Sequence, residues 1–257
     1  MKMNLESQRV VVFGAARGIG RGIAEGFAAQ QCQVFGVDRE AIGSADGQSS
    51  IAFSVCDVTS FEAVRGVADS IGEVDHVVYS VGVGSGKVGF PFWNLDPADW
   101  SPVLEVNLIG AVNVAHAFAP RLAQQRQGSL LFLVSVAGQI GSQTDPPYSA
   151  AKAGLINFMQ CAAKDLARYG VRANALSPGM VRTGLNRSVW EASQQALPLS
   201  QRQGYDEWAE GKIRTVAPLG RWQAIEEYAA MAVFLASNHA RNITGQTINI
   251  DGGQVMR

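Results

Sequence analysis

Short apolar runs alternate along the chain with longer stretches in which apolar residues recur every three or four positions. Runs rich in Val, Ile, Leu and Phe are typical of strands that helices cover on both faces, and the longer stretches predict those helices. The predicted strands are 9–13, 33–37, 51–55, 75–80, 129–135, 171–176 and 246–250. The predicted helices are 18–30, 60–71, 99–124, 148–169 and 225–236. This alternation predicts an α/β fold with one doubly wound parallel sheet of the Rossmann type and helices on both faces.

One segment, 182–217, interrupts this alternation. It is too long for an ordinary connection between a strand and a helix, and too rich in aromatic residues for a disordered one. Ordered insertions of this kind often act as lids, and Trp190 and Trp208 are candidates either for the surface of a lid or for its internal core. Because no linker or internal repeat divides the chain, we expect residues 1–257 to form a single domain that includes this lid.

The charge of the chain argues against one large class of function. The 257 residues carry 21 basic and 22 acidic side chains, which gives a net charge of −1. Nucleic-acid-binding surfaces normally show a basic excess, so we expect no nucleic-acid partner. We also find no apolar run of membrane-span length and no signal-peptide pattern at the start, which predicts a cytoplasmic protein without a membrane partner.

The three cysteines, Cys32, Cys56 and Cys161, are far apart, and each lies in an apolar-patterned segment. Neither a C-x-x-C motif nor zinc-ligand spacing occurs, and the three histidines are isolated from one another. We therefore expect buried free thiols in a reducing compartment and no metal site.

A glycine-rich turn follows the first predicted strand. Gly14, Gly18 and Gly20 in GAARGIG stand between that strand and the next helix. Glycines there allow a tight turn and a close approach of the backbone to a pyrophosphate at the helix N-terminus. A purely structural turn is the alternative, and the strand–turn–helix context favours dinucleotide binding. A second glycine-rich stretch, GVGSGK at 82–87, lacks the outer Gly and the Ser or Thr that a P-loop requires.

Asp38 ends the second predicted strand and follows Gly20 at roughly the offset at which an acidic side chain accepts hydrogen bonds from the adenosine ribose. Its charge would repel a 2′-phosphate, which favours NAD. Arg17 and Arg39 favour NADP instead, because guanidinium groups are preferred phosphate partners. We expect NAD, with NADP as the less favoured cofactor, and a simple turn role for Asp38 stays open.

Tyr148 and Lys152 are four residues apart at the start of a predicted helix, so their side chains share one face. An ammonium group beside a phenol favours the phenolate and lowers the tyrosine pKa, and such a tyrosine can exchange a proton with an alcohol or a ketone. Ser135 ends the preceding strand, where its hydroxyl can orient a substrate oxygen. A Tyr-x-x-x-Lys pair alone also occurs on exposed helices, so this interpretation depends on the rest of the chain.

Further short motifs make the chain similar to the short-chain dehydrogenase/reductase family over essentially its whole length. Besides the glycine-rich turn, the matching positions are Asp57 in CDV, Asn107 in EVNLIG, Ser135 in VSVAG, Tyr148 and Lys152 in YSAAK, Pro178 and Gly179 with Thr183 after them, and Asp251, Gly252 and Gly253. The resemblance implies a Rossmann-type fold, a nicotinamide cofactor, and hydride exchange between the nicotinamide and an alcohol or carbonyl carbon.

The resemblance also implies a role for each matching residue. Tyr148 is the acid/base, Lys152 holds the nicotinamide ribose and lowers the tyrosine pKa, Ser135 steadies the substrate oxygen, and Asn107 supports a water-linked proton relay. The expected cofactor-binding residues are Gly14, Arg17, Gly18, Ile19, Gly20, Asp38, Arg39, Asp57, Val58, Ser80, Val81, Gly82, Tyr148, Lys152, Pro178, Gly179, Val181 and Thr183. The expected substrate contacts are Ser135, Gln139, Gln143 and Tyr148.

Two positions depart from the family pattern. Phe13 stands where Thr is usual before the first glycine, and the sequence YSVG at 79–82 replaces Asn-Asn-Ala-Gly. The asparagines mainly stabilise the sheet, so we expect local hydrogen bonding to differ there while the catalytic set is kept.

The substrate stays open among small polyol or sugar-type alcohols, hydroxysteroids and 3-oxoacyl thioesters. We favour a small polyol, sugar-type or hydroxy compound, with a 3-oxoacyl thioester reductase as the alternative. A non-catalytic dinucleotide-sensing protein is a further alternative, and the intact catalytic set argues against it. Many family members are tetramers, so the resemblance implies a homotetramer, or a homodimer, with the apolar helix around 157–166 as a candidate interface.

Overall fold

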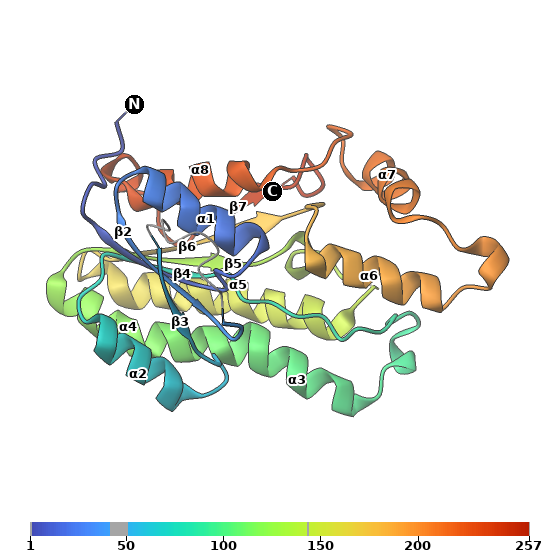
Figure 1. Cartoon of the computed structure of the whole chain (residues 1–257), viewed down its shortest axis with the longest axis horizontal. Helices are drawn as coiled ribbons and strands as arrows, with labels where there is room; N and C mark the ends of the chain where they lie inside the picture. The colour runs from blue at the N-terminus through green and yellow to red at the C-terminus, as the bar shows by residue number, and fades with distance from the viewer. Residues whose placement is uncertain (1, 42–50, 143, 257) are drawn as a thin grey trace.

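The computed structural model describes residues 2–41, 51–142 and 144–256, and its centre is one parallel sheet (Figure 1). Within these ranges the strand order is β3-β2-β1-β4-β5-β6-β7, and each neighbouring pair is parallel. The strand bounds are β1 Arg9–Phe13, β2 Gln33–Asp38, β3 Ile51–Val55, β4 His76–Tyr79, β5 Ser129–Leu133, β6 Arg172–Pro178 and β7 Thr247–Ile250. This confirms the predicted doubly wound sheet. The strand order reverses between β1 and β4, the place where such sheets bind ligands.

Helices cover both faces of the sheet, as predicted (Figure 1). α1 and α8 lie on one face, and α2, α4 and α5 lie on the other. The helix bounds are α1 Gly18–Ala29, α2 Phe61–Ile71, α3 Trp100–Leu104, α4 Gly110–Gln125, α5 Pro146–Ala167, α6 Gly184–Gln195, α7 Tyr205–Val216 and α8 Ile225–Ala236.

Strand β1 shows why the strands form unbroken apolar runs. Val10 and Val12 pack in the cluster that contains α1 and α8, whereas Val11 and Phe13 pack with the helices of the opposite face. All four side chains are fully buried, because each face of the strand meets a layer of helices. The polar groups that carry the chemistry therefore lie beyond the ends of the strands.

The stretch predicted as one helix over 99–124 contains a π-helical turn, η3 Glu105–Ile109, between α3 and α4. The Tyr79 hydroxyl donates a hydrogen bond to the Val106 carbonyl oxygen in this turn. Gly110 follows directly, and a Cβ there would lie 2.6 Å from the Tyr79 hydroxyl oxygen. Tyr79 stands where the family that the sequence resembles has an asparagine. The Tyr79 hydroxyl is hydrogen-bonded to the π-helical turn, and such turns are often found at functional sites.

The helical stretch 97–125 corrects the expectation that the chain has no apolar run of membrane-span length. It is 29 residues long and its mean hydropathy reaches 1.3 over 18 residues, so by length and composition it could cross a membrane. In this structure 39% of that window is buried, and Val114, Phe118 and Leu122 of α4 lie in the core beside the sheet. The place of α4 in the fold accounts for the apolar residues on its buried side.

The cysteine prediction holds for two of the three residues. Cys32 and Cys56 are buried, whereas Cys161 is exposed on α5, and all three thiols are free. The buried stripe of α5 passes through Met159 and Ala163, and Cys161 lies outside it. The apolar pattern of α5 therefore predicts its buried stripe, and Cys161 is an apolar residue that lies outside that stripe. Among the described residues, no group of His, Cys, Asp and Glu is arranged to hold a metal ion.

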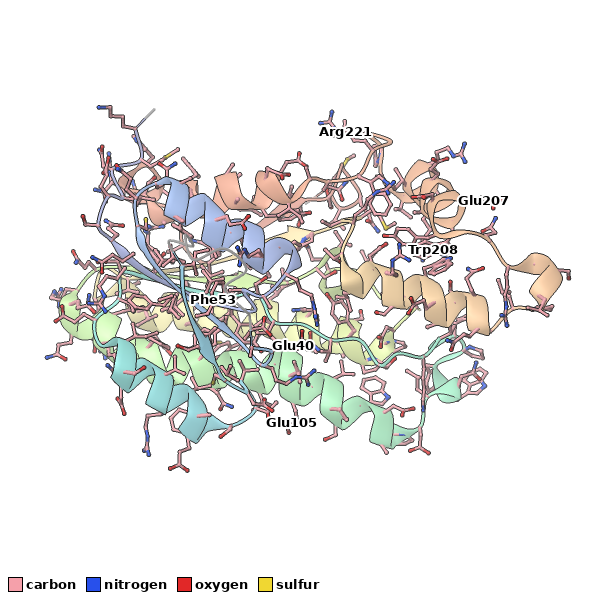
Figure 2. The ribbon with its side chains drawn as sticks, in the orientation of Figure 1. Glu40, Phe53, Glu105, Glu207, Trp208 and Arg221 are labelled. Carbon is pink, nitrogen blue, oxygen red and sulfur yellow. The ribbon has the colours of Figure 1, made fainter. Side chains whose placement is uncertain are left out.

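The predicted lid segment forms α6 and α7, which project beyond the sheet (Figure 1). The Tyr205 ring packs against Trp190 and Trp208, with centroids 5.7 Å and 6.2 Å apart. Figure 2 shows Trp208 between the two helices. The two tryptophans thus form a core inside the segment, which decides between the alternatives that the sequence left open. Closure of the segment over a substrate stays a prediction.

Candidate active site

The glycine-rich turn joins β1 to α1 at the carboxyl end of the sheet. Gly14 has a φ of 85° and Gly18 a φ of 58°, in the left-handed region that glycine favours. A Cβ at Gly14 would lie 2.8 Å from the Ser80 carbonyl group, and one at Gly20 would lie 2.1 Å from the Gly14 carbonyl oxygen. The turn therefore requires glycine, and its backbone lies directly against the residue that follows β4.

The N-terminus of α1 begins inside this turn. Arg17 is its N-cap, the Arg17 side chain makes no capping hydrogen bond, and the first helical turn holds no acidic residue. Its first N–H groups therefore suit an anion such as a pyrophosphate. Thr183 lies opposite, because a Cβ at Gly18 would be 3.5 Å from Thr183 Cγ2. The residues present thus fit a dinucleotide.

Asp38, at the end of β2, lies beside the glycine-rich turn. Its Oδ2 accepts a hydrogen bond from the Ala16 N–H at 3.0 Å, and its Oδ1 accepts one from the Glu40 N–H at 3.3 Å. Arg17 Nη1 pairs with Glu40 Oε2 at 2.8 Å, and Figure 2 labels Glu40 near the centre of the view. The Asp38 carboxylate is therefore fixed at the end of its strand, and Arg17 is engaged by an acidic neighbour.

Asp57 follows β3 and fixes the turn before α2. Its Oδ1 accepts hydrogen bonds from the Thr59 N–H at 2.9 Å and from the Thr59 hydroxyl at 2.7 Å. These bonds lower the pKa of Asp57, and the charge of Arg39 lowers it further. Arg39, the second arginine expected as a phosphate partner, therefore also lies near a carboxylate, that of Asp57. Val58, next to Asp57, is buried in the core.

Ser135, Tyr148 and Lys152 meet beyond the carboxyl end of β5. Ser135 comes just after this strand, and the other two lie on the first turns of α5. The side chains of Ser135 and Tyr148 are hydrogen-bonded. Lys152 Nζ donates to the Leu133 carbonyl oxygen at 2.8 Å and lies 5.6 Å from the centroid of the Tyr148 ring. The structure therefore brings together the three residues that the sequence singled out.

Asn107 lies in the π-helical turn and is fully buried. Its Nδ2 donates to the carbonyl oxygens of Val83 and Val103, both at 2.8 Å, and its Oδ1 accepts from the Val83 N–H at 3.3 Å. A Cβ at Gly82 would lie 3.2 Å from Asn107 Oδ1 and 3.5 Å from Lys152 Nζ. Gly82 therefore passes between these two polar side chains, and its lack of a side chain lets them approach.

The protein alone does not lower the pKa of Tyr148. Burial raises this pKa to about 12, and a hydrogen bond with Ser135 opposes the rise while the charge of Asp145 adds to it. Burial also lowers the pKa of Lys152 to about 7. The groups that shift the pKa of Tyr148 here are Ser135 and Asp145, besides burial, so the effect of Lys152 on the phenolate stays a prediction.

Gln139, one of the two glutamines expected at the substrate, is hydrogen-bonded to two side chains of the sheet. Gln139 Nε2 donates to Ser177 Oγ at 2.6 Å and to Asn249 Oδ1 at 2.5 Å, so its amide is turned toward β6 and β7. Gln143 lies outside the described residues. Substrate contact by either glutamine stays a prediction.

The end of β6 is closed by the C-terminal motif. Pro178 is the last residue of the strand, and a Cβ at Gly179 would lie 2.9 Å from Asp251 Cα. The Asp251 carboxylate accepts hydrogen bonds from two backbone N–H groups of the C-terminal turn, at 2.9 Å and 2.8 Å. Val181 is buried. These contacts fix the backbone that leads from the sheet to Thr183.

One residue of the site escaped the sequence analysis. Asp145 is the N-cap of α5, three positions before Tyr148, and only 8% of it is exposed. Asp directly before Pro at the first helical position is a recognisable helix start. That pattern predicts that Asp145 caps α5. It does not predict the contact that the second carboxylate oxygen of Asp145 makes with the loop after β4.

Comparison with known proteins settles the family. A family model described as Enoyl-(Acyl carrier protein) reductase matches residues 14–254, nearly the whole chain. The chain belongs to the short-chain dehydrogenase/reductase family. As a short-chain dehydrogenase/reductase it is an oxidoreductase, and enzymes of this family use nicotinamide cofactors.

Relatives of this short-chain dehydrogenase/reductase match along their whole length. The 3-oxoacyl-(acyl-carrier-protein) reductase of Escherichia coli (strain K12) is 32% identical over 263 residues, which cover 99% of this chain and 100% of that protein. The protein of the same name from Thermotoga maritima is 31% identical over 265 residues, with 99% and 100% covered. The ligand-free structure of Thermoplasma acidophilum aldohexose dehydrogenase superposes with a TM-score of 0.86 at 26% identity, covering 100% of this chain and 97% of that one.

Proposed function

We propose that this protein transfers a hydride between NAD and a secondary alcohol or ketone, with Tyr148 as the acid/base. The observation that carries the proposal is the meeting of Ser135, Tyr148 and Lys152 beside Gly82, at the strand ends that also carry the glycine-rich turn. The hydride chemistry is supplied by the nicotinamide when it is bound, and the protein binds, orients and moves the proton.

Each side chain of the site has its own task in this proposal. The Tyr148 hydroxyl gives its proton to a carbonyl oxygen in reduction and takes a proton from an alcohol in oxidation. Ser135, hydrogen-bonded to Tyr148, orients the substrate oxygen. Lys152, anchored to the Leu133 carbonyl oxygen, holds the nicotinamide ribose. Asn107 fixes the backbone beside Gly82 and supports a water-linked relay to Lys152.

The remaining cofactor contacts follow the edge of the sheet. The turn at the start of α1 and Thr183 hold the pyrophosphate, Asp38 accepts hydrogen bonds from the adenosine ribose, and Asp57 lies at the adenine. The other residues that we assign to this surface are Arg17, Ile19, Arg39, Val58, Ser80, Val81, Pro178, Gly179 and Val181.

For the substrate we propose a small polyol, sugar-type or hydroxy compound. The superposition on an aldohexose dehydrogenase over the whole chain supports this choice. A 3-oxoacyl thioester is the second candidate, which the sequence identity to 3-oxoacyl-(acyl-carrier-protein) reductases favours. The complete set of Ser135, Tyr148, Lys152 and Asn107 argues against a non-catalytic dinucleotide sensor.

A panel of polyols, aldoses, hydroxysteroids and 3-oxoacyl thioesters tests the proposal. Formation or loss of the reduced nicotinamide is followed by absorbance, with NAD and NADP in parallel. Turnover of an alcohol or ketone supports the proposal, and the best substrate in the panel chooses between the two candidates. Cofactor binding without turnover of any compound would favour the sensor.

The unmodified protein should prefer NAD over NADP by roughly tenfold to a hundredfold in catalytic efficiency, because a partly screened clash between the Asp38 carboxylate and a 2′-phosphate costs on the order of 1–3 kcal/mol. Asp38→Ala should narrow this preference with little loss of turnover. Asp38→Asn is the matched control, since it removes the charge and keeps an oxygen for the Ala16 N–H. A preference for NADP in the unmodified protein would show that Arg17 and Arg39 dominate.

We also propose that the protein is a homotetramer in the cytoplasm, with a homodimer as the alternative. A groove of about 560 Å³ lies between α4 and the end of α5, lined by His116, Pro120, Lys164, Arg168 and Tyr169 among others, and it borders the apolar helix that the resemblance implies as an interface. Sedimentation equilibrium should give four times the 27.3 kDa mass of one chain. A monomer at micromolar concentration would contradict the assembly.

A further inference from the structure

Asp145 makes two contacts that none of the roles above uses. Its Oδ1 accepts a hydrogen bond from the Tyr148 N–H at 3.5 Å, as the N-cap of α5. Its Oδ2 accepts one from the Ser85 N–H at 2.7 Å. Ser85 belongs to the segment 82–89, which leaves the end of β4 and runs beside Asn107 and Lys152 to the start of α5. The same carboxylate therefore joins this segment to the helix that carries the acid/base.

The segment 82–89 is attached at two further places. Asn107 binds the backbone of Val83, as described above. The Gly89 N–H donates to the Thr144 carbonyl oxygen at 3.0 Å. The contact of Asp145 lies between these two, so it fixes the middle of the segment against the start of α5.

The space around the Asp145 carboxylate is tightly filled. A Cβ at Gly84 would lie 2.8 Å from Asp145 Oδ2 and 3.7 Å from Leu185 Cδ1 of α6. Three chain segments therefore meet around Gly84: the loop after β4, the start of α5 and the start of the lid segment. Glycine at 84 is what allows the carboxylate to reach the Ser85 N–H.

The charges that face Tyr148 come from few groups. Its own helix contributes Asp145 and Lys152, and the turn after β5 contributes the neutral Ser135. Lys87, in the segment 82–89, is exposed and its ammonium group is held by the Asp99 carboxylate at 2.8 Å, so it does not contribute to the pKa of Tyr148. From α6, the side chain near Asp145 is the apolar Leu185.

Asp145 opposes ionisation of Tyr148. Burial raises the pKa of Asp145, while hydrogen bonds from Ser85 and the Tyr148 N–H oppose that rise and stabilise its carboxylate form. The negative charge of this carboxylate adds to burial in raising the pKa of Tyr148. The protonated tyrosine is the form that protonates a carbonyl oxygen, and the phenolate is the form that takes a proton from an alcohol.

We propose that Asp145 is a positioning residue: through its contacts with the Ser85 N–H and the Tyr148 N–H it anchors the segment 82–89 against the start of α5 and places a negative charge beside the helical turn that carries the acid/base. This inference rests on the proposed function of Tyr148. The step moves one proton, from the Tyr148 hydroxyl to the carbonyl oxygen, as the carbonyl carbon receives the hydride, and it leaves an alcohol and a phenolate. Alcohol oxidation runs the same step backwards and needs the phenolate at the start.

The pH profile of the full-length protein tests the electrostatic part. Asp145→Asn and Asp145→Ser both remove the charge and keep an oxygen that can cap α5. In each variant the acid limb of the alcohol oxidation profile should move to lower pH, because the charge that raises the pKa of Tyr148 is removed, and oxidation at a pH on that limb should be faster. The KM for substrate should rise, because the segment 82–89 loses its middle attachment.

Asp99→Asn is the matched control. Asp99 also holds the segment 82–89, through Lys87, and the substitution removes the same charge from a carboxylate that does not contribute to the pKa of Tyr148. Its profile should keep the midpoint of the unmodified protein. An unmoved midpoint in both Asp145 variants, or an equal shift in Asp99→Asn, would overturn the inference. Failure of both Asp145 variants to fold would also overturn it, because Asp145 would then act only as the structural cap of α5.

Hydrogen exchange at the Ser85 amide tests the anchor without turnover. Exchange should accelerate in Asp145→Ser, whose hydroxyl is too short to replace the 2.7 Å contact made by the carboxylate, and it should change less in Asp99→Asn, which releases the segment only at Lys87. Equal exchange in the unmodified protein and Asp145→Ser would overturn the anchoring role. Absence of turnover in the unmodified protein with every compound of the panel would instead overturn the proposed function, so the two failures are distinguishable.

Discussion

Replacing Tyr148 by Phe should reduce turnover by at least about a hundredfold and leave folding and cofactor binding intact. The substitution removes only the hydroxyl that gives or takes the proton. The ring keeps its place near Lys152, whose Nζ is 5.6 Å from the ring centroid, and Lys152 keeps its bond to the Leu133 carbonyl oxygen. Steady-state rates with the best substrate of the panel measure the loss, and a cofactor titration checks that binding persists.

Tyr169→Phe is the matched control for this substitution. Tyr169 comes just after the other end of α5, where the guanidinium of Arg168 lies 4.8 Å from its ring centroid. It loses the same hydroxyl far from Ser135 and should turn over substrate at the ordinary rate. Turnover within a few-fold of normal in Tyr148→Phe would contradict the acid/base role.

Replacing Lys152 by Ala should slow turnover by at least about a hundredfold and also weaken cofactor binding by at least about tenfold. Lys152 is 2% exposed, and its removal takes away the proposed ribose contact. It also leaves the Leu133 carbonyl oxygen without its donor, a loss of about 1–3 kcal/mol when a buried acceptor stays unpaired. Titration of the reduced cofactor by fluorescence separates the change in affinity from the change in rate, and thermal unfolding measures the cost to stability.

The two substitutions are distinguished by cofactor affinity. Tyr148→Phe should bind the cofactor normally, whereas Lys152→Ala should not. Lys164→Ala, an exposed position on the same helix, is the control and should leave both quantities unchanged. Normal cofactor affinity in Lys152→Ala would contradict the ribose role and leave Lys152 with an effect on the proton alone.

The sheet could be predicted from the sequence because its strands meet helices on both faces. Val10 to Phe13 are all buried, so all of them are apolar, and this unbroken apolar run predicts the strand. The π-helical turn could not be predicted, because it is bonded to a side chain from a different element, the Tyr79 hydroxyl. The exposure of Cys161 was missed for a related reason: a helix of 22 residues buries a narrow stripe, and one apolar residue can lie beside it.

The candidate site was predictable where its residues stand at the ends of elements. Ser135 follows a strand and Tyr148 follows a helix cap, so topology brings them together. Properties that depend on packing were not predictable. The pKa of Tyr148 is raised by burial, and the amide of Gln139 is taken up by Asn249, which is distant in sequence.

Tyr79 and Gly110 fill one shared volume, and this restricts the order in which the chain can acquire changes. Alanine at 110 would place a carbon 2.6 Å from the Tyr79 hydroxyl oxygen. A smaller residue at 79 would leave a void beside the Val106 carbonyl oxygen and remove its donor. Tyrosine at 79 is therefore compatible only with glycine at 110, so a larger residue at 110 could be introduced only after residue 79 had been shortened.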